Sequence, residues 1–176
     1  EGKAAAKYFS IFNIMIRQSE FTFNGRTKRP PKDAVNTMLS FVYTLIAHEV
    51  ESALETVGLD PYIGYLHSLR PGRSSLALDL MEEFRAYWGD RFVLSLINLR
   101  IVTISDFQYH IDEQVLLTDK GRKKILTQWQ KRKKEILMHP YLNEKVVIGL
   151  LPYTQAMLFA RYLRGDLDNY PIFVVK

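Results

Sequence analysis

The feature that most constrains the fold is a long apolar stretch between a pair of prolines and a glycine. Pro30-Pro31 cannot continue a helix, and Asp33 is suited to cap a helix that starts directly after it. Over residues 34–57 apolar side chains recur with helical spacing, and Gly58 then closes the stretch. The sequence therefore predicts one long apolar helix over these residues.

The segments on either side of this helix add more helix and little strand. Helical spacing covers residues 1–18, and Asn24-Gly25 then supplies turn chemistry. We expect a short helix or turn at 62–67, helices at 76–89, at 90–100, from 105, at 118–138 and at 143–165, and short strands or extended segments at 109–117 and 170–175. Ser74 or Ser75 can cap the helix at 76–89, Thr118 can cap the basic helix, and Pro152 can kink the last one. The predicted fold is mainly α: a multi-helix, bundle-like catalytic domain with room for one short hairpin or terminal strand.

Length and composition point to one globular domain over residues 1–176. The chain has 176 residues, 47% of them hydrophobic, which is enough for a sizeable core. No apolar run is long enough to span a membrane, and no secretory pattern occurs. The absence of cysteine excludes disulfides, cysteine-based zinc sites and thiol nucleophiles, and it fits a reducing cytoplasm, where we expect the protein. Because the chain opens at Glu1 without a methionine and within a helical pattern, we expect it to be a piece of a longer protein.

The charge balance leans mildly toward polyanionic partners. There are 24 Lys and Arg against 19 Asp and Glu, giving a net charge of +5. The basic residues concentrate between Lys120 and Lys134. This helix also carries the apolar residues Ile125 and Trp129, and its four consecutive bases are Lys131, Arg132, Lys133 and Lys134. A solvated surface helix and a nucleic-acid-binding surface are equally good interpretations.

Two carboxylates within residues 76–89 form the first candidate site. Asp79 and Glu82 are three residues apart and share one helix face, whereas Glu83 points elsewhere. The mostly apolar neighbours favour burial, and two buried carboxylates repel each other unless a cation neutralises them. Taken alone, however, the pair fits a solvated acidic face or a core ion pair better than a metal site.

His67 shifts this balance toward a metal. It ends an apolar, glycine-punctuated stretch, where an imidazole is unfavourable unless its ring nitrogens find partners. One imidazole with carboxylates and water suits Mn²⁺ or Mg²⁺. A third protein ligand is wanted, and the neighbouring loop supplies none. Arg70, Arg73 and Arg85 add cations beside the proposed site and favour a phosphate substrate.

The remaining motifs carry less chemistry. His48 begins like a zinc-protease helix, but Ser52 stands where the second histidine must be. His110 and His139 have no carboxylate constellation around them and are expected to be structural. The segment around Ser74 lacks the final glycine of a nucleophile elbow, and no glycine-rich phosphate loop occurs.

Four stretches resemble a known family in order and spacing. They are EGKAAAKYF, RPPKDAVNTMLSFVYTLI, GLDPYIGYLH and RPGRSSLALDLMEEFR, all within about residues 1–100. They are similar to the C-terminal catalytic domain of the CRISPR-associated endonuclease and integrase that captures new spacers, the Cas-one family. The basic helix continues the likeness more loosely, and Val42 departs from the glycine usual in that family.

The resemblance implies a catalytic set and its metal. In that family a divalent ion is bound by the glutamate of an E-G-x-A-A motif, the histidine ending a G-[FY]-[LIV]-H motif and an acidic residue of a D-x-x-[DE] pair. Carried over, the metal ligands are Glu1, His67 and Glu82, with Asp79 as the neighbouring catalytic acid. The expected cofactor is Mg²⁺ or Mn²⁺. The expected DNA-binding residues are Arg70, Arg73, Arg85, Lys131, Arg132, Lys133 and Lys134.

The resemblance also implies partners and a reaction. The partners are double-stranded DNA, a second copy of the full-length protein joined through an N-terminal β-rich domain that this chain lacks, and a small CRISPR partner of the Cas-two family. The reaction is phosphodiester transesterification, in which the 3′-hydroxyl of a short duplex attacks a phosphate of the CRISPR repeat, with nicking when water attacks instead. Two other classes stay open: a non-enzymatic helical DNA-binding module, and a metal hydrolase of small phosphates, against which the basic helix argues.

Overall fold

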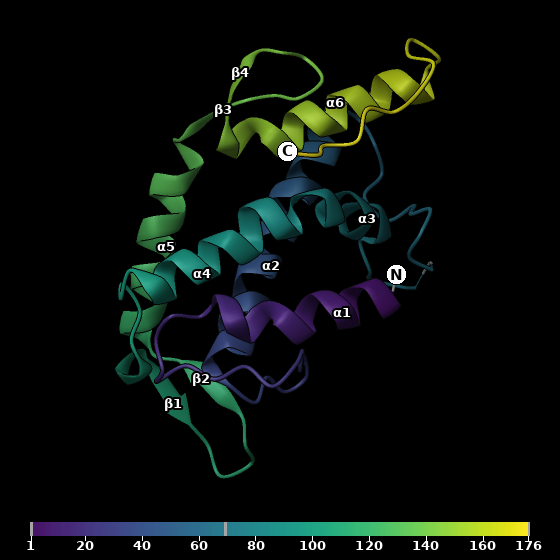
Figure 1. The fold of residues 1–176 in the computed structure, drawn as a ribbon. Helices are drawn as coiled ribbons and strands as arrows, with labels where there is room; N and C mark the ends of the chain where they lie inside the picture. Colours follow the sequence, from purple (N-terminus) through teal and green to yellow (C-terminus); the bar gives the residue numbers. More distant parts are fainter. Residues whose placement is uncertain (1, 69, 176) are drawn as a thin grey trace. The chain divides into compact units, whose positions relative to one another are not determined.

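The computed structural model describes residues 2–68 and 70–175, and Figure 1 shows them as a mainly α-helical chain. The α-helices of these residues are α1 (Gly2–Phe12), α2 (Ala34–Thr56), α3 (Ser75–Phe84), α4 (Arg91–Asn98), α5 (Asp119–Lys133) and α6 (Leu151–Leu163). Two antiparallel pairs of short strands join β1 (Phe107–Tyr109) to β2 (Val115–Leu117) and β3 (Ile136–Met138) to β4 (Lys145–Val147). The predicted mainly α fold is confirmed.

The long helix predicted from the apolar stretch is α2. Asp33 caps it, because its Oδ1 accepts a hydrogen bond from the backbone N–H of Asn36 at 2.7 Å. Gly58 follows the helix with a φ of 81°, a left-handed conformation that glycine adopts without strain. Val42, which stands where the similar family has glycine, is fully buried.

The chain divides into two compact units. The first comprises Glu1–Tyr43 and Gly89–Trp129, and the second comprises Thr44–Trp88 and Gln130–Lys176. In the first unit, Phe12 and Phe23 pack with their ring centroids 5.1 Å apart, and the buried Asp90 accepts hydrogen bonds from two tyrosine hydroxyls, those of Tyr8 and Tyr43. That residues 1–176 form a single domain stays a prediction.

The second unit carries α3, α6 and the β3–β4 hairpin. Helix α3 contacts α6, and its buried residues are Ser75, Leu76, Ala77, Leu80, Met81 and Phe84. After Phe84 the backbone widens into a π-helical segment, η2 (Arg85–Asp90). The ring of Phe84 contacts that of Phe173 in the C-terminal segment, with the ring centroids 5.7 Å apart. The core of this unit therefore fixes α3, the helix with the candidate carboxylates.

Two helix predictions are wrong in their extent, whereas at 62–67 the expected alternative of a turn is what forms. The helix expected from 105 is one short 3₁₀ turn, η3 (Ile104–Asp106), that leads into β1. The basic helix ends at Lys133 instead of 138, and residues 136–138 are β3. Leu137 pairs with Val146 across the β3–β4 hairpin, a contact between segments that helical spacing alone does not reveal.

The last helix begins later than expected. Residues 145–147 are β4, η4 (Ile148–Leu150) follows, and α6 starts at Leu151. Pro152 lies in the first turn of α6, where its missing N–H is not needed, so it starts the helix and does not kink it. Residues 170–175 form no regular secondary structure and pair with no strand within the described part of the chain, so the alternative of a terminal strand does not form. None of the described helices is both long and apolar enough to cross a membrane.

Candidate functional site

Gly64 lets the loop before α3 approach the helix very closely. A Cβ atom at this position would lie 2.6 Å from Cβ of Ser75 and 2.9 Å from Oδ2 of Asp79. Such contacts are far inside van der Waals distance, so only glycine fits here without movement of the loop or the helix. Because of this close approach, the backbone N–H groups of residues 65–67 lie within hydrogen-bonding distance of the Asp79 side chain.

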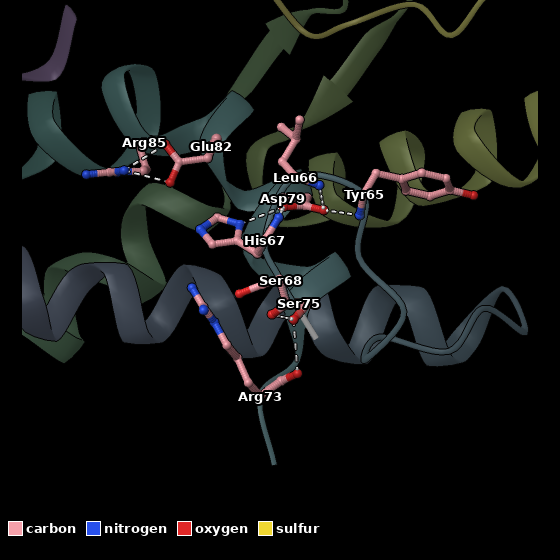
Figure 2. Close-up of polar contacts among 9 residues, drawn as sticks. All are labelled: Tyr65, Leu66, His67, Ser68, Arg73, Ser75, Asp79, Glu82 and Arg85. Atoms are coloured by element: carbon pink, nitrogen blue, oxygen red, sulfur yellow. Dashed lines mark hydrogen bonds and ion pairs between the residues drawn. The ribbon is translucent and has the colours of Figure 1, made fainter. Parts of the chain in front are cut away.

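Asp79 binds this loop through four contacts. Its carboxylate accepts backbone N–H bonds from Tyr65 at 2.6 Å, Leu66 at 2.9 Å and His67 at 2.9 Å, and its Oδ1 lies 2.6 Å from Nδ1 of His67 (Figure 2). Burial favours the neutral acid, but the hydrogen bonds from Leu66, the His67 ring and the other two N–H groups together outweigh burial and lower the pKa of Asp79. Asp79 is therefore a carboxylate that organises the loop.

This contact selects one tautomer of His67. An ionised Asp79 can only accept hydrogen bonds, so Nδ1 of the ring carries the proton that it shares with Oδ1. In the neutral ring Nε2 then presents its lone pair, and no described residue bonds to that nitrogen. The His67 side chain is 23% exposed, so solvent or a ligand can reach the ring. Carboxylates commonly orient metal-binding histidines in this way, so the geometry is compatible with the expected role of His67.

Glu82 has a different partner. The Nη1 atom of Arg85 donates to both of its carboxylate oxygens, at 2.6 and 2.7 Å (Figure 2). Arg85 is among the expected DNA-binding residues, and in the structure its guanidinium lies against this carboxylate. The structure thus joins His67 to Asp79 and Glu82 to Arg85. Glu1, the remaining predicted ligand, lies outside the described residues, and those residues contain no group of three or more His, Asp or Glu arranged to hold a metal ion.

An open apolar pocket of about 570 Å³ lies beside the three acidic residues of α3, Asp79, Glu82 and Glu83. It is lined by Tyr65, Leu66, Leu76, Asp79, Leu80, Glu82, Glu83, Phe159, Tyr162, Leu163, Tyr170 and Ile172. Its walls come from the loop before α3, from α3 and α6, and from the C-terminal segment. Asp79 and Glu82 both reach this pocket, as expected from their shared helix face. Glu83 also lines it, so the expectation that Glu83 points elsewhere is wrong, because residues four apart, such as Asp79 and Glu83, share a helix face as well.

Glu83 is the residue that sequence reasoning passed over. Its carboxylate accepts hydrogen bonds from Nε2 of Gln155 at 2.7 Å, from the hydroxyl of Tyr170 at 2.7 Å and from the backbone N–H of Phe173 at 2.9 Å. Burial dominates the balance and raises the pKa of Glu83, although these three donors oppose the shift. The only sequence signal was a carboxylate in an apolar helix, because its partners lie more than 70 positions away.

The expected DNA-binding residues divide into two groups. Arg70, Lys131 and Lys134 are exposed and Arg73 is half-buried, and none of these four forms an ion pair within the described part of the chain. The other two members of the basic run are engaged within the protein.

Arg132 pairs with Glu135, and its guanidinium lies 5.7 Å from the centre of the Tyr87 ring. Lys133 pairs with Glu49. Only part of the basic run is therefore presented to solvent for phosphate binding.

His139 is structural, as expected. It is fully buried, Nδ1 accepts the backbone N–H of Leu142 at 3.2 Å, and Nε2 lies 3.0 Å from Oε1 of Gln155. Since Nδ1 accepts, Nε2 carries the proton and donates to Gln155.

Comparisons with known proteins agree on one family. The model of the family "CRISPR associated protein Cas1" matches residues 1–131. The CRISPR-associated endonuclease Cas1 1 of Chlorobaculum tepidum is 53% identical over 176 residues, which cover 99% of this chain and 51% of that protein. The chain therefore spans about half the length of this curated relative.

Two solved structures have the same fold. A Cas1 protein from Thermotoga maritima has a TM-score of 0.83 at 31% identity, covering 93% of this chain and 50% of that one. A casposase bound to its integration product has a TM-score of 0.86 at 27% identity, covering 97% of this chain and 50% of that one. With the histidine, the carboxylates and the fold in place, the family match leads to one conclusion: the chain belongs to the Cas1 family.

Proposed function

We propose that this chain is the catalytic part of a Cas1 endonuclease and integrase that inserts new spacers into a CRISPR array. The observation that carries the proposal is the His67–Asp79 pair, which turns the lone pair of Nε2 outward beside the helix that bears Glu82. Relatives named as Cas1 endonucleases and a casposase captured with its integration product support the same activity.

The donor set fits a divalent ion. A neutral imidazole nitrogen and carboxylate oxygens are the mixture that suits Mn²⁺ or Mg²⁺ with water completing the shell. His67 and Glu82 would hold the ion together with Glu1, which lies outside the described residues. When bound, the ion would polarise a non-bridging phosphate oxygen and stabilise the charge that develops there.

The other side chains of the site orient the metal ligands or bind the DNA backbone. Asp79 keeps the His67 ring in one orientation and one tautomer. Arg85 donates to both oxygens of Glu82 and so fixes the orientation of this carboxylate. Arg70 and Arg73, in the loop between His67 and α3, would hold the DNA backbone near the reacting phosphate, and the exposed Lys131 and Lys134 would bind other phosphates.

The reaction we propose is phosphodiester transesterification. A 3′-oxygen bonds to phosphorus as the bond to the leaving oxygen breaks, so the number of phosphodiester bonds is unchanged, and the attacking hydroxyl proton ends on the leaving oxygen. When water attacks instead, the strand is nicked. The partners in this proposal are double-stranded DNA, a second copy of the full-length protein and a small Cas-two protein; the similar casposase, which is bound to its integration product, supports the first.

One observation favours a second candidate, a non-enzymatic helical DNA-binding module. The described residues hold no three-donor metal group, and Glu82 is paired with Arg85. The test incubates the full-length protein with a duplex carrying a CRISPR repeat and a short donor duplex. Joining that requires Mn²⁺ or Mg²⁺ and stops with a chelator is the expected result, whereas binding without nicking or joining would support the second candidate.

A further inference from the structure

The carboxylate of Glu83 links three parts of the second unit: α3, α6 and the C-terminal segment. It accepts bonds from the side chain of Gln155 on α6 and from the hydroxyl of Tyr170 and the N–H of Phe173 on the C-terminal segment. The Nε2 atom of Gln155 also reaches the Tyr170 hydroxyl at 2.8 Å and the carbonyl of Pro171 at 3.1 Å. We call Glu83, Gln155, Tyr170 and Phe173 the C-terminal latch.

The orientation of Gln155 is fixed from its far side. The buried His139 donates through Nε2 to Oε1 of Gln155, so the amide nitrogen of Gln155 must face Glu83. A chain of oriented hydrogen bonds therefore runs from the β3–β4 hairpin through α6 to α3. Because each member has its partner inside the second unit, the latch is a rigid polar network.

Helix α3 is attached to its surroundings at two points, one on each side of Glu82 in the sequence. Asp79 ties the helix to the loop that carries His67, and Glu83 ties it to α6 and the C-terminal segment, while Glu82 lies between these two attachments. Tyr170 and Ile172 of the same segment also form part of the pocket wall beside Glu82. A rotation of α3 about its axis would break one attachment or the other.

We propose that Glu83 is a positioning residue: by fastening the C-terminal segment to α3 it fixes the helix face that presents Glu82 to the metal and Asp79 to the His67 loop. This inference rests on the proposed function, since it assigns Glu83 a role in metal binding at that site. Glu83→Ala removes all three hydrogen bonds. Glu83→Gln can keep them, because its amide oxygen can accept from Gln155 and Phe173 while its amide nitrogen donates to the Tyr170 hydroxyl.

The first measurement is hydrogen exchange of the Phe173 amide in the full-length protein. We expect Glu83→Ala to speed its exchange by about tenfold or more, the effect of losing a hydrogen bond to a charged acceptor. Glu83→Gln should stay near the parent. Tyr170→Phe, which removes only one hydroxyl and keeps the ring, should change exchange in the same direction but less, and it keeps the test valid if Glu83→Ala does not fold.

The second measurement is Mn²⁺ affinity, read from the spin resonance signal of the free ion. We expect Glu83→Ala to weaken Mn²⁺ binding by about tenfold, the lower end of the effect of losing an outer partner of a metal site, with recovery in Glu83→Gln. Leu54→Ala is the matched control, because it opens a cavity in the fully buried core of the same unit without touching the latch. It should lower Tm and leave Mn²⁺ affinity within about twofold of the parent, since the ligand geometry is unchanged.

Three results would overturn the inference. They are a Phe173 amide that stays protected in Glu83→Ala, an unchanged Mn²⁺ affinity in that variant, and an equal loss of affinity in Leu54→Ala. A parent protein that binds no Mn²⁺ and joins no DNA would instead overturn the proposed function, and the exchange measurement would still show whether the latch holds the C-terminal segment.

Discussion

At the scale of single residues, the chemistry of His67 depends on Asp79. The ring can offer Nε2 to a metal only while Nδ1 carries the proton, and the Asp79 carboxylate 2.6 Å away stabilises that form. The sequence places both residues in the site but assigns Asp79 the role of a neighbouring acid. In the structure it orients the histidine and folds the loop at the same time, through three backbone N–H bonds that no sequence pattern specifies.

Asp79→Asn tests this role. The amide keeps the size of the side chain but replaces one of its two oxygens with an NH2 group. That group faces either the backbone N–H of Leu66 or the Nδ1–H of His67, so either the loop or the tautomer is disturbed. We expect Mn²⁺ affinity of the full-length protein to fall by about 10–100-fold, measured by calorimetry. Asp112→Asn, on the exposed tip of the β1–β2 hairpin, is the control. An affinity for Asp79→Asn equal to that of the control would show that Asp79 does not support the metal ligand.

At the scale of elements, the approach of the 60–68 loop to α3 depends on one glycine. Gly64→Ala would place a methyl group 2.6 Å from Cβ of Ser75, so the loop must move away from the helix. The backbone donors of Asp79 move with it. We expect destabilisation of about 1–3 kcal/mol in urea unfolding, together with weaker Mn²⁺ binding. Gly72→Ala is informative beside it, because Gly72 has a φ of 70° but open space around it. It should lower stability without lowering Mn²⁺ affinity, and equal affinities for both variants would contradict this account.

A second element, the start of α5, is held by a buried carboxylate. Asp106 pairs with Lys124 at 2.6 Å. Burial opposes ionisation, but the hydrogen bond from Lys124 and those from Thr103 outweigh it and lower the pKa of Asp106 from the ordinary value of 3.8. A lowered folded-state pKa gives stability that is complete above the unfolded-state pKa and is lost as pH falls through the folded-state pKa.

Asp106→Asn should therefore lower stability by about 1–3 kcal/mol at neutral pH, because Lys124 loses its charged partner. The difference between parent and variant should stay constant down to about pH 4 and narrow below 3.8. Urea unfolding of both proteins across this range measures it. A difference that already shrinks between pH 7 and pH 5 would assign the effect to another group.

The sequence predicts those elements that are formed by contacts between residues close together in the chain, and it misses those that depend on distant residues. Helix α2 is local: its cap at Asp33, its apolar spacing and the glycine that ends it lie within one stretch. The end of α5 and the late start of α6 depend instead on the pairing of β3 with β4. Residues 136–138 and 145–147 form these strands, although their local sequence is compatible with helix. The latch around Glu83 is likewise long-range and could not be read from spacing.

At the scale of the whole molecule, the net charge of +5 favours nucleic acid, but only exposed charges bind it. Lys131 and Lys134 are exposed, whereas Lys133 is paired with Glu49. We expect the double substitution Lys131→Ala and Lys134→Ala to flatten the plot of log DNA affinity against log salt by about 0.9 for each phosphate that the variant no longer neutralises. Lys133→Ala should change the slope less. Equal slopes for the parent and the double variant would make the run a solvated surface.

The central claim is that His67 and Glu82 hold a catalytic metal, and it is tested most directly by strand joining in the full-length protein. His67→Ala deletes the imidazole and Glu82→Gln removes a charged ligand, while neither alters the basic surface. Glu55→Gln, on an exposed position of α2, is the matched control. We predict that both variants lose Mn²⁺-dependent nicking and joining by about 100-fold or more while DNA binding in chelator stays near that of the parent. Folded variants that keep joining within about threefold of Glu55→Gln would contradict the account.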